Sequence, residues 1–344
     1  MAVASTPPLQ LVIAALLALS LSTTASSSPA PANRSSCYKR LFSFGDSLTD
    51  TGNYIIHYSN ASGPVLALPY GETFFGRPTG RWSDGRLIID FIVERLGFQY
   101  WPAYLKGAAG KSPAEEFRVD LLTPSPIPPY SLGVQIDLFK KVLAMLASTD
   151  QERKEVMSSS LFLVGEIGLN DYNHPFLQNK TLEWVRPLVP QVISSIVLSI
   201  EALIELGAKT MYVPGIFPLG CTPLYLSLFP GDDRDPATGC LRGVNDLILA
   251  HNHMLETKLE ELRRDHPGVS ITYVNWFDKE TVLEACYPVF ISGSAAVPCV
   301  DPSKHVNFDG LHMTEAVYKL MARGMLDGPF AAPSIMSTTC NHGC

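Results

Sequence analysis

The chain has 344 residues, of which 46% are hydrophobic, and a formal net charge of -7. This length can bury a sizeable core in one large domain or two small ones. The negative charge, with no basic cluster, excludes the positive face that a nucleic-acid partner requires.

Residues 1–25 have the pattern of a secretory signal peptide. A short apolar run lies between Leu9 and Leu21, and the small residues Thr23–Ala25 that follow suit a cleavage site. The run is shorter than the roughly 20 apolar residues that span a bilayer, which favours a cleaved leader over the alternative of an uncleaved membrane anchor. We expect no later segment to be long and apolar enough to span a membrane, and therefore no stable membrane anchor.

Two further features are consistent with secretion. Sequons at Asn33, Asn60 and Asn179 predict N-linked glycosylation. The seven cysteines form no Cys-x-x-Cys pair, so neither a zinc ribbon nor a redox motif is indicated. In an oxidising compartment disulfides are the default, and we expect the local pairs Cys221–Cys240 and Cys286–Cys299. The odd count leaves at least one thiol free or paired between chains.

The rest of the chain predicts a linker followed by a single α/β domain. Residues 26–36, rich in Ser, Pro and Ala, are expected to be a disordered linker, and residues 37–344 the domain. In chain order we expect a strand at 41–44, helices at 87–96 and 131–146 around a Pro-rich loop at 124–129, a strand at 161–164, a helix at 182–206 interrupted near Pro187 and Pro190, a strand at 210–213, a helix at 244–264, a strand at 269–274, and a last helix that Thr314 caps and that runs through Met325.

Alternation of apolar strands with helices predicts a parallel sheet that is covered on both faces. In such a sheet, the loops at the carboxyl ends of the strands carry the functional site. The unusual polar residues of this chain follow its predicted strands, which places them at that edge.

Ser47 follows the first predicted strand in the segment Phe-Gly-Asp-Ser-Leu-Thr-Asp. A serine hydroxyl attacks a carbonyl only when a base takes its proton. Gly45 permits a tight turn that presents Ser47 at the strand end. Gly-Asp-Ser alone favours a plain polar turn, so Ser47 becomes a candidate nucleophile only with partners elsewhere in the chain.

Asp309 and His312 are such partners, because a carboxylate three residues before a histidine can fold back onto its Nδ1 in a turn. That contact fixes the tautomer and leaves Nε2 facing the nucleophile. Asn170 follows the second predicted strand, and its amide either donates to a developing oxyanion or serves as a cap or turn residue. Each of these signals is weak when taken alone.

In combination they resemble the plant type of the GDSL esterase/lipase family of SGNH hydrolases. The segments that carry this resemblance extend over most of the predicted domain: Phe42–Asn53, Gly80–Arg86, Gly165–Tyr172, Pro218–Cys221 and Asp309–Ala316.

The resemblance implies a flavodoxin-like, three-layer α/β/α fold with strand order 2-1-3-4-5. It implies that Ser47 is the nucleophile, that His312 is the general base and acid, and that Asp309 orients His312. Asn170 and the backbone N–H of Ser47 would belong to the oxyanion hole. It implies neither a metal nor a cofactor.

The function so implied is that of a secreted carboxylic-ester hydrolase of the cell wall or apoplast, acting through an acyl-enzyme on Ser47. Its substrates would be small-molecule, lipid or acetylated polysaccharide esters. Two alternatives remain open: a catalytically impaired secreted protein that binds a glycan or lipid, and an acyltransferase, in which an alcohol replaces water as acceptor.

One segment departs from the family pattern. Plant relatives carry an Asn-Phe-Ala-x-x-Gly-Ala-like segment whose glycine donates to the oxyanion, and none stands between Arg118 and Pro124. Gly107, Gly110 and Gly133 are nearby, but none is assigned the role. We therefore expect edge strand 2 to be missing and, since one oxyanion donor is worth about 10²–10³ in rate, catalysis to be weakened.

Other polar and aromatic residues are expected to be structural. His251 and His253 lie on the predicted helix 244–264, where a solvated face is favoured over a metal site. Trp82 and Trp101 are expected to pack in the interior or to line a pocket.

Overall fold

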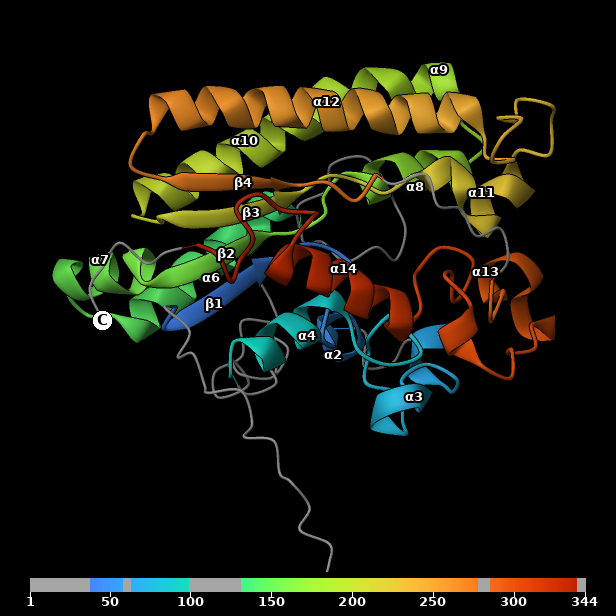
Figure 1. Ribbon diagram of the computed structural model, residues 1–344, viewed down its shortest axis with the longest axis horizontal. Helices are drawn as coiled ribbons and strands as arrows, with labels where there is room; N and C mark the ends of the chain where they lie inside the picture. Colours follow the sequence, from blue (N-terminus) through green and yellow to red (C-terminus); the bar gives the residue numbers. More distant parts are fainter. Residues whose placement is uncertain (1–37, 58–62, 99–130, 278–284, 339–344) are drawn as a thin grey trace, which may run out of the picture. The chain divides into compact units, whose positions relative to one another are not determined.

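The computed structural model describes residues 38–57, 63–98, 131–277 and 285–338, all within the compact unit Ser36–Cys344 (Figure 1). The predicted signal peptide, linker and Pro-rich loop lie outside these residues. So do Asn33, Asn60, Trp101, Gly107, Gly110, Cys37, Cys340 and Cys344.

The described elements, in chain order, are β1 (Arg40–Phe44), α2 (Asn53–His57), η1 (Pro64–Leu66), α3 (Glu72–Phe75), α4 (Ile88–Arg95), α6 (Leu132–Leu146), α7 (Asp150–Ser158), β2 (Ser160–Val164), α8 (Leu169–Leu177), α9 (Leu182–Val185), η2 (Arg186–Leu188), α10 (Val189–Glu205), β3 (Thr210–Pro214), η3 (Leu219–Cys221), α11 (Pro223–Leu228), α12 (Arg242–Asp265), β4 (Ser270–Val274), α13 (Val289–Ser292), η4 (Gly293–Ala295), η5 (Pro302–Lys304) and α14 (Glu315–Asp327).

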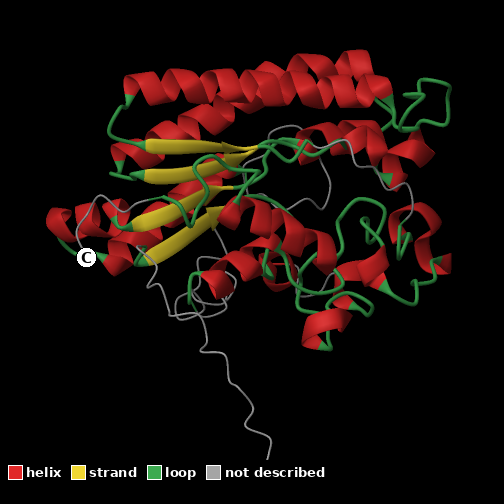
Figure 2. Cartoon of the chain, viewed as in Figure 1, coloured by secondary structure: helices red, strands yellow, loops and turns green. Residues whose placement is uncertain are grey.

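The four described strands form one parallel sheet in the order β1-β2-β3-β4 (Figure 2). This confirms the expected parallel sheet. Each strand is a short apolar run, and all residues of β2 are buried, as a sheet covered on both faces requires. These four strands correspond to strands 1, 3, 4 and 5 of the expected order 2-1-3-4-5. The chain that would hold strand 2 falls within residues 99–130, outside the described part, so its absence stays a prediction.

Helices cover both faces of the sheet, which gives the expected three layers (Figure 1). Successive strand residues point to opposite faces. Phe42 packs its ring on Phe139 of α6 at 4.8 Å, whereas the neighbouring Ser43 borders a small cavity together with Ile88 of α4 and Met325 of α14. Helices α6, α10 and α12 contact one another in series on the first face, and α4 packs on α14 on the second.

The predicted helices are confirmed to within a few residues, including the interruption near Pro187 and Pro190. There the 3-10 segment η2 separates α9 from α10, because each proline lacks an N–H donor and clashes with the preceding turn. The prediction that the Thr314 side chain caps α14 is wrong, because it makes no hydrogen bond to the helix start. Thr314 occupies the cap position, but its hydroxyl donates to the carbonyl of His305, and Asp84 instead accepts the N–H of Glu315 at 2.7 Å.

The expectation that no later segment could span a membrane needs correction. By length and composition, the helical stretch Leu182–Glu205 passes that test. One side of α10 is nevertheless part of the protein core: Val192, Ile193 and Ile196 are buried there, and α10 packs on α6 and α12. We attribute its apolar character to this packing.

Both expected disulfides are present, Cys221–Cys240 and Cys286–Cys299. The first joins η3 to the residues just before α12. The second closes the segment after β4, whose backbone pairs with the chain leading to Asp309: Cys286 N–H donates to the carbonyl of Asn307 at 2.9 Å.

Candidate functional site

Ser47 lies immediately beyond β1, in a turn that two features of the sequence build. Gly45 has φ +153°, and a Cβ there would come within 2.7 Å of the Thr49 side chain, so only glycine fits. The side chain of Gln135 on α6 accepts from Gly45 N–H and donates to Gly45 C=O, both at 2.9 Å. The turn that carries Ser47 is thereby fixed to the helix layer behind it.

Asp309 and His312 lie in a second turn, which the aspartate itself closes. Its Oδ1 accepts the backbone N–H of Leu311 at 3.0 Å and of His312 at 2.7 Å. Gly310 between them has φ +112°, a conformation that favours glycine. The spacing of three residues therefore brings the carboxylate back to the imidazole, as the sequence suggests.

The two turns meet in a continuous chain of hydrogen bonds. Nε2 of His312 is 2.8 Å from Oγ of Ser47, and Nδ1 of His312 is 2.7 Å from Oδ2 of Asp309. A carboxylate can only accept, so Nδ1 carries the proton and Nε2 is free to accept from the serine hydroxyl. This is the arrangement that activates a serine for attack on a carbonyl.

Asp309 is fully buried and remains ionised in this setting. Burial acts to raise the pKa of Asp309, but neighbouring His312 and the hydrogen bonds from the backbone of His312 and Leu311 hold that pKa below its ordinary value. A further donor comes from far away in sequence: the hydroxyl of Tyr70 donates to Oδ2 of Asp309 at 2.8 Å. No local pattern around Tyr70 predicted this contact.

The segment Gly80–Arg86 contacts the imidazole of His312 and the helices α4 and α14. Trp82 stacks on His312, with ring centroids 5.0 Å apart and planes inclined by 29°. Arg81 forms a buried, bidentate ion pair with Asp90 of α4, and both N···O distances are 2.7 Å. Arg86 pairs with Glu315 at 2.8 Å. Trp82 is thus packing as expected, but its packing partner is the candidate base.

Asn170 is the second residue of α8, and Gly168 is the N-cap. With φ +110°, Gly168 leaves no room for a side chain, because a Cβ would lie 2.9 Å from His251. The Asn170 amide nitrogen donates to Oδ2 of Asp46 at 3.1 Å. An amide NH₂ has two hydrogens, so this bond fixes its orientation and leaves one hydrogen for an oxyanion.

Two carboxylic acids lie under this site. Burial raises the pKa of Asp46 to about 6. Glu166 is buried, and neither carboxylate oxygen forms a hydrogen bond of good geometry with a described residue. Burial and the charge of Asp46 raise the pKa of Glu166 well above the ordinary value, and the nearby backbone N–H of Phe217 opposes that rise. Asp46 and Glu166 border a cavity of about 30 Å³, together with Ser43, Leu163 and Trp276.

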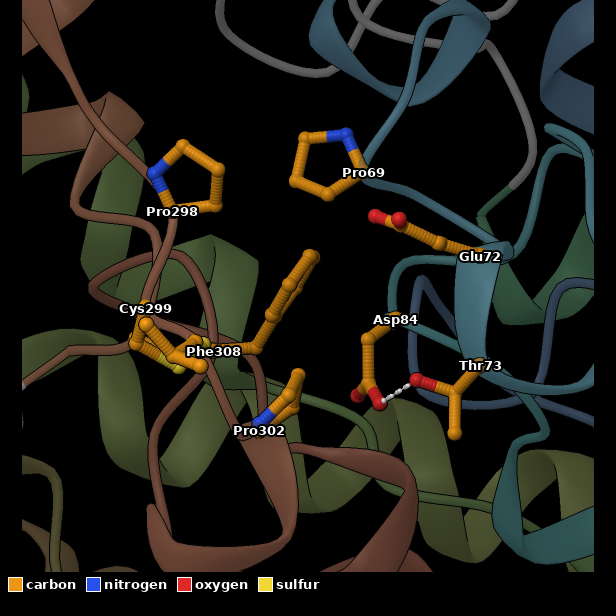
Figure 3. A pocket seen from close by; sticks show the side chains of 10 residues that line it. Pro69, Glu72, Thr73, Asp84, Pro298, Cys299, Pro302 and Phe308 are labelled. Carbon is orange, nitrogen blue, oxygen red and sulfur yellow. Dashed lines mark hydrogen bonds between the residues drawn. A yellow bond between two sulfur atoms is a disulfide. The ribbon is translucent and has the colours of Figure 1, made fainter.

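A larger cavity of about 180 Å³ lies elsewhere (Figure 3). Its lining includes Glu72, Asp84 and Phe308, and Asp84 accepts a hydrogen bond from Thr73 at its wall. Neither Ser47 nor His312 borders it. The hydrogen-bonded chain, rather than this cavity, identifies the candidate site.

His251 is not on a solvated face, which corrects that expectation. It is fully buried among the apolar residues of α12, between Leu247 and Leu255, and burial lowers its pKa to about 4. Its Nδ1 lies 2.8 Å from the hydroxyl of Tyr172. The helical spacing of four from both leucines could have revealed this. His253 is exposed, as expected.

Comparison with known proteins relates the chain to ester hydrolases. Residues 41–325 match the family described as GDSL-like lipase/acylhydrolase. A sinapine esterase from Brassica napus is 40% identical over 342 residues, covering 86% of this chain and 87% of that protein. A GDSL esterase/lipase from Arabidopsis thaliana is 41% identical over 337 residues, with coverage of 86% and 87%.

Proposed function

Because this chain belongs to the GDSL-like lipase/acylhydrolase family and is an ester-bond hydrolase, we propose that it cleaves carboxylic esters through an acyl-enzyme on Ser47. The observation that carries the proposal is the Ser47–His312–Asp309 chain, with contacts of 2.8 and 2.7 Å. The names of the relatives support an ester substrate, and that of the Brassica napus protein makes sinapine a candidate to assay first.

In the proposed reaction, Nε2 of His312 takes the proton of Ser47 Oγ as that oxygen attacks the ester carbonyl. Asp309 stabilises the imidazolium that forms. The tetrahedral oxyanion accepts from Ser47 N–H and from the hydrogen of the Asn170 amide that Asp46 leaves unused. His312 then returns its proton to the leaving alcohol, and in a second round it activates the water that hydrolyses the acyl-enzyme.

We also propose secretion to the cell wall or apoplast and glycosylation. The apolar leader and the sequons support this, and Asn179 is exposed in the turn after α8. N-terminal sequencing of secreted protein, with and without glycosidase, tests it. An intact Met1 on an unglycosylated product would overturn it.

The decisive experiment for catalysis is labelling of the purified mature protein by a fluorophosphonate. We expect the wild type to be labelled and Ser47→Ala to remain unlabelled. Ser194→Ala, an exposed serine of α10, is the matched control and should label like the wild type. Equal labelling of wild type and Ser47→Ala would exclude Ser47 as the nucleophile.

A further inference from the structure

We infer that Tyr70 is a positioning residue of the hydrolytic site, whose hydroxyl holds the Asp309 carboxylate in line with His312. The inference rests on the proposed function. It adds to the Ser47–His312–Asp309 chain a fourth member that lies 239 residues from Asp309 in sequence.

Tyr70 completes the hydrogen bonding of a carboxylate that water does not reach. Oδ1 of Asp309 accepts two backbone N–H groups, from Leu311 and His312. Oδ2 accepts from Tyr70 at 2.8 Å and faces Nδ1 of His312 at 2.7 Å. A carboxylate has about four acceptor positions, so both oxygens are fully used. Without the hydroxyl, the oxygen nearest the imidazole has one partner fewer and the carboxylate is freer to rotate.

The Tyr70 ring is held so that its hydroxyl cannot turn away. Tyr70 has no exposed surface. Its ring makes edge contacts with Phe308 at 5.0 Å, Trp82 at 6.1 Å and Tyr287 at 6.2 Å. Phe308 directly precedes Asp309, and Trp82 stacks on His312. The same packing that fixes Tyr70 therefore also fixes the two side chains on which it acts.

The hydroxyl is a neutral donor at any working pH, because burial and the charge of Asp309 raise the pKa of Tyr70. It draws charge from Oδ2, and its removal concentrates negative charge on the oxygen that faces the imidazole. The protonated imidazole is then favoured in the free enzyme, so activity should begin to rise at a higher pH. Asp46 and Tyr318 also interact electrostatically with His312 and Asp309, respectively, and a change at Tyr70 leaves both in place.

The test is Tyr70→Phe in the full mature chain, which removes the hydroxyl and keeps the ring. We expect kcat to fall about tenfold with little change in KM, since a hydrogen bond to a charged group is partly lost. The acidic limb of the kcat/KM pH profile should move upward. Tyr287→Phe is the control: its ring contacts Tyr70 and Phe308, and no described bond joins its hydroxyl to Asp309. It should behave as wild type.

A double-mutant cycle with Asp309→Asn separates positioning from general packing. If Tyr70 acts through Asp309, Tyr70→Phe should cost little more in the Asp309→Asn background. Full additivity, or wild-type kcat and pH profile in Tyr70→Phe, would overturn the inference. If the wild type hydrolyses esters and Tyr70→Phe leaves kcat and the pH profile unchanged, only this inference is refuted. If no fluorophosphonate labels the wild type, the proposed function is refuted.

Fluorinated tyrosine incorporated at position 70 tests the same bond without removing it. Fluorine makes the hydroxyl a stronger donor, so the acidic limb should move downward, opposite to its direction in Tyr70→Phe. If Tyr70→Phe fails to fold, the fluorotyrosine variant alone tests whether the Tyr70 hydroxyl acts on Asp309. An unchanged limb would count against the inference.

Discussion

The carboxylate of Asp84 accepts the backbone N–H of Glu315 at 2.7 Å, although 231 residues separate them. Its second oxygen accepts from Thr73 at 2.5 Å. Asp84 thereby caps the helix α14, which begins three residues after His312. The segment Gly80–Arg86 thus fixes both the imidazole, through Trp82, and the helix start behind it.

Asp84→Ala should destabilise the protein and lower its activity. The variant loses the acceptor that caps the first N–H of α14 and also the acceptor of the Thr73 hydroxyl, so we expect the free energy of unfolding to fall by roughly 1–3 kcal/mol. Denaturant unfolding measures this. Thr149→Ala removes the surface cap of α7 and should cost about 1 kcal/mol with no change in kcat. Equal effects of the two variants on kcat would show that Asp84 does not support the site.

The second prediction concerns Ser47 and His312 acting as one unit. Ser47→Ala should reduce hydrolysis of a short-chain aryl ester on the order of 10⁴-fold or more and leave folding intact, because Ser47 lies on a turn and not in the core. His312→Ala should be nearly as damaging, and the double variant little worse. Asp309→Asn should be milder. Steady-state kinetics with circular dichroism measures all four, and fully additive losses would argue that the two residues work separately.

The third prediction concerns Asn170. Asn170→Ala should lower kcat by about 10²–10³ with KM nearly unchanged, because the amide acts on the oxyanion and not on the ground state. Asp46→Asn should lower kcat less, since it loosens the amide without removing it. Asn275→Ala, at an exposed position after β4, serves as the control.

The glycine donor that we expect to be missing provides a further test of Asn170. Insertion of an Asn-Phe-Ala-x-x-Gly-Ala-type segment between Arg118 and Pro124 should raise both kcat and the melting temperature. It should also make Asn170→Ala less costly, since another donor would share the oxyanion. A native chain already as fast and as stable as the extended one would mean that a glycine elsewhere donates.

The sheet and much of the site follow from local patterns in the sequence. All four strands begin and end within one residue of prediction because each is a short apolar run. The Asp309–His312 turn closes through contacts between residues three apart, so its spacing carries the signal. Helix α7 was missed because its residues are mostly polar, although the reciprocal cap of Thr149 and Glu152 was readable.

Contacts between distant segments left no such signal. Tyr70 reaches Asp309 and Asp84 reaches Glu315 across more than two hundred residues. Each of these residues has an ordinary local sequence, and only the packed chain brings the partners together. The two hydrogen bonds between the Gln135 side chain and the Gly45 backbone likewise join helix α6 to the end of β1.

The last prediction concerns the buried acid Glu166. Its pKa lies above the ordinary value in the folded protein, so the native state binds more protons than the unfolded state once the pH exceeds that ordinary value. Stability should therefore fall as pH rises. Glu166→Gln keeps the shape and removes the titration. The variant should match the wild type below about pH 4 and gain about 1.4 kcal/mol at higher pH for each unit of pKa shift relieved.

Melting temperatures measured between about pH 4 and about pH 8 decide this. Glu260→Gln, on the exposed side of α12, is the control and should show no such divergence. Because the charge of Asp46 contributes to the raised pKa of Glu166, Asp46→Asn should shrink the gain from Glu166→Gln. A difference between wild type and Glu166→Gln that stays constant with pH would mean that Glu166 does not titrate differently in the folded chain. Glu166 would then be an ordinary polar residue, whose carboxylate oxygens water satisfies in the cavity of about 30 Å³ that Glu166 borders.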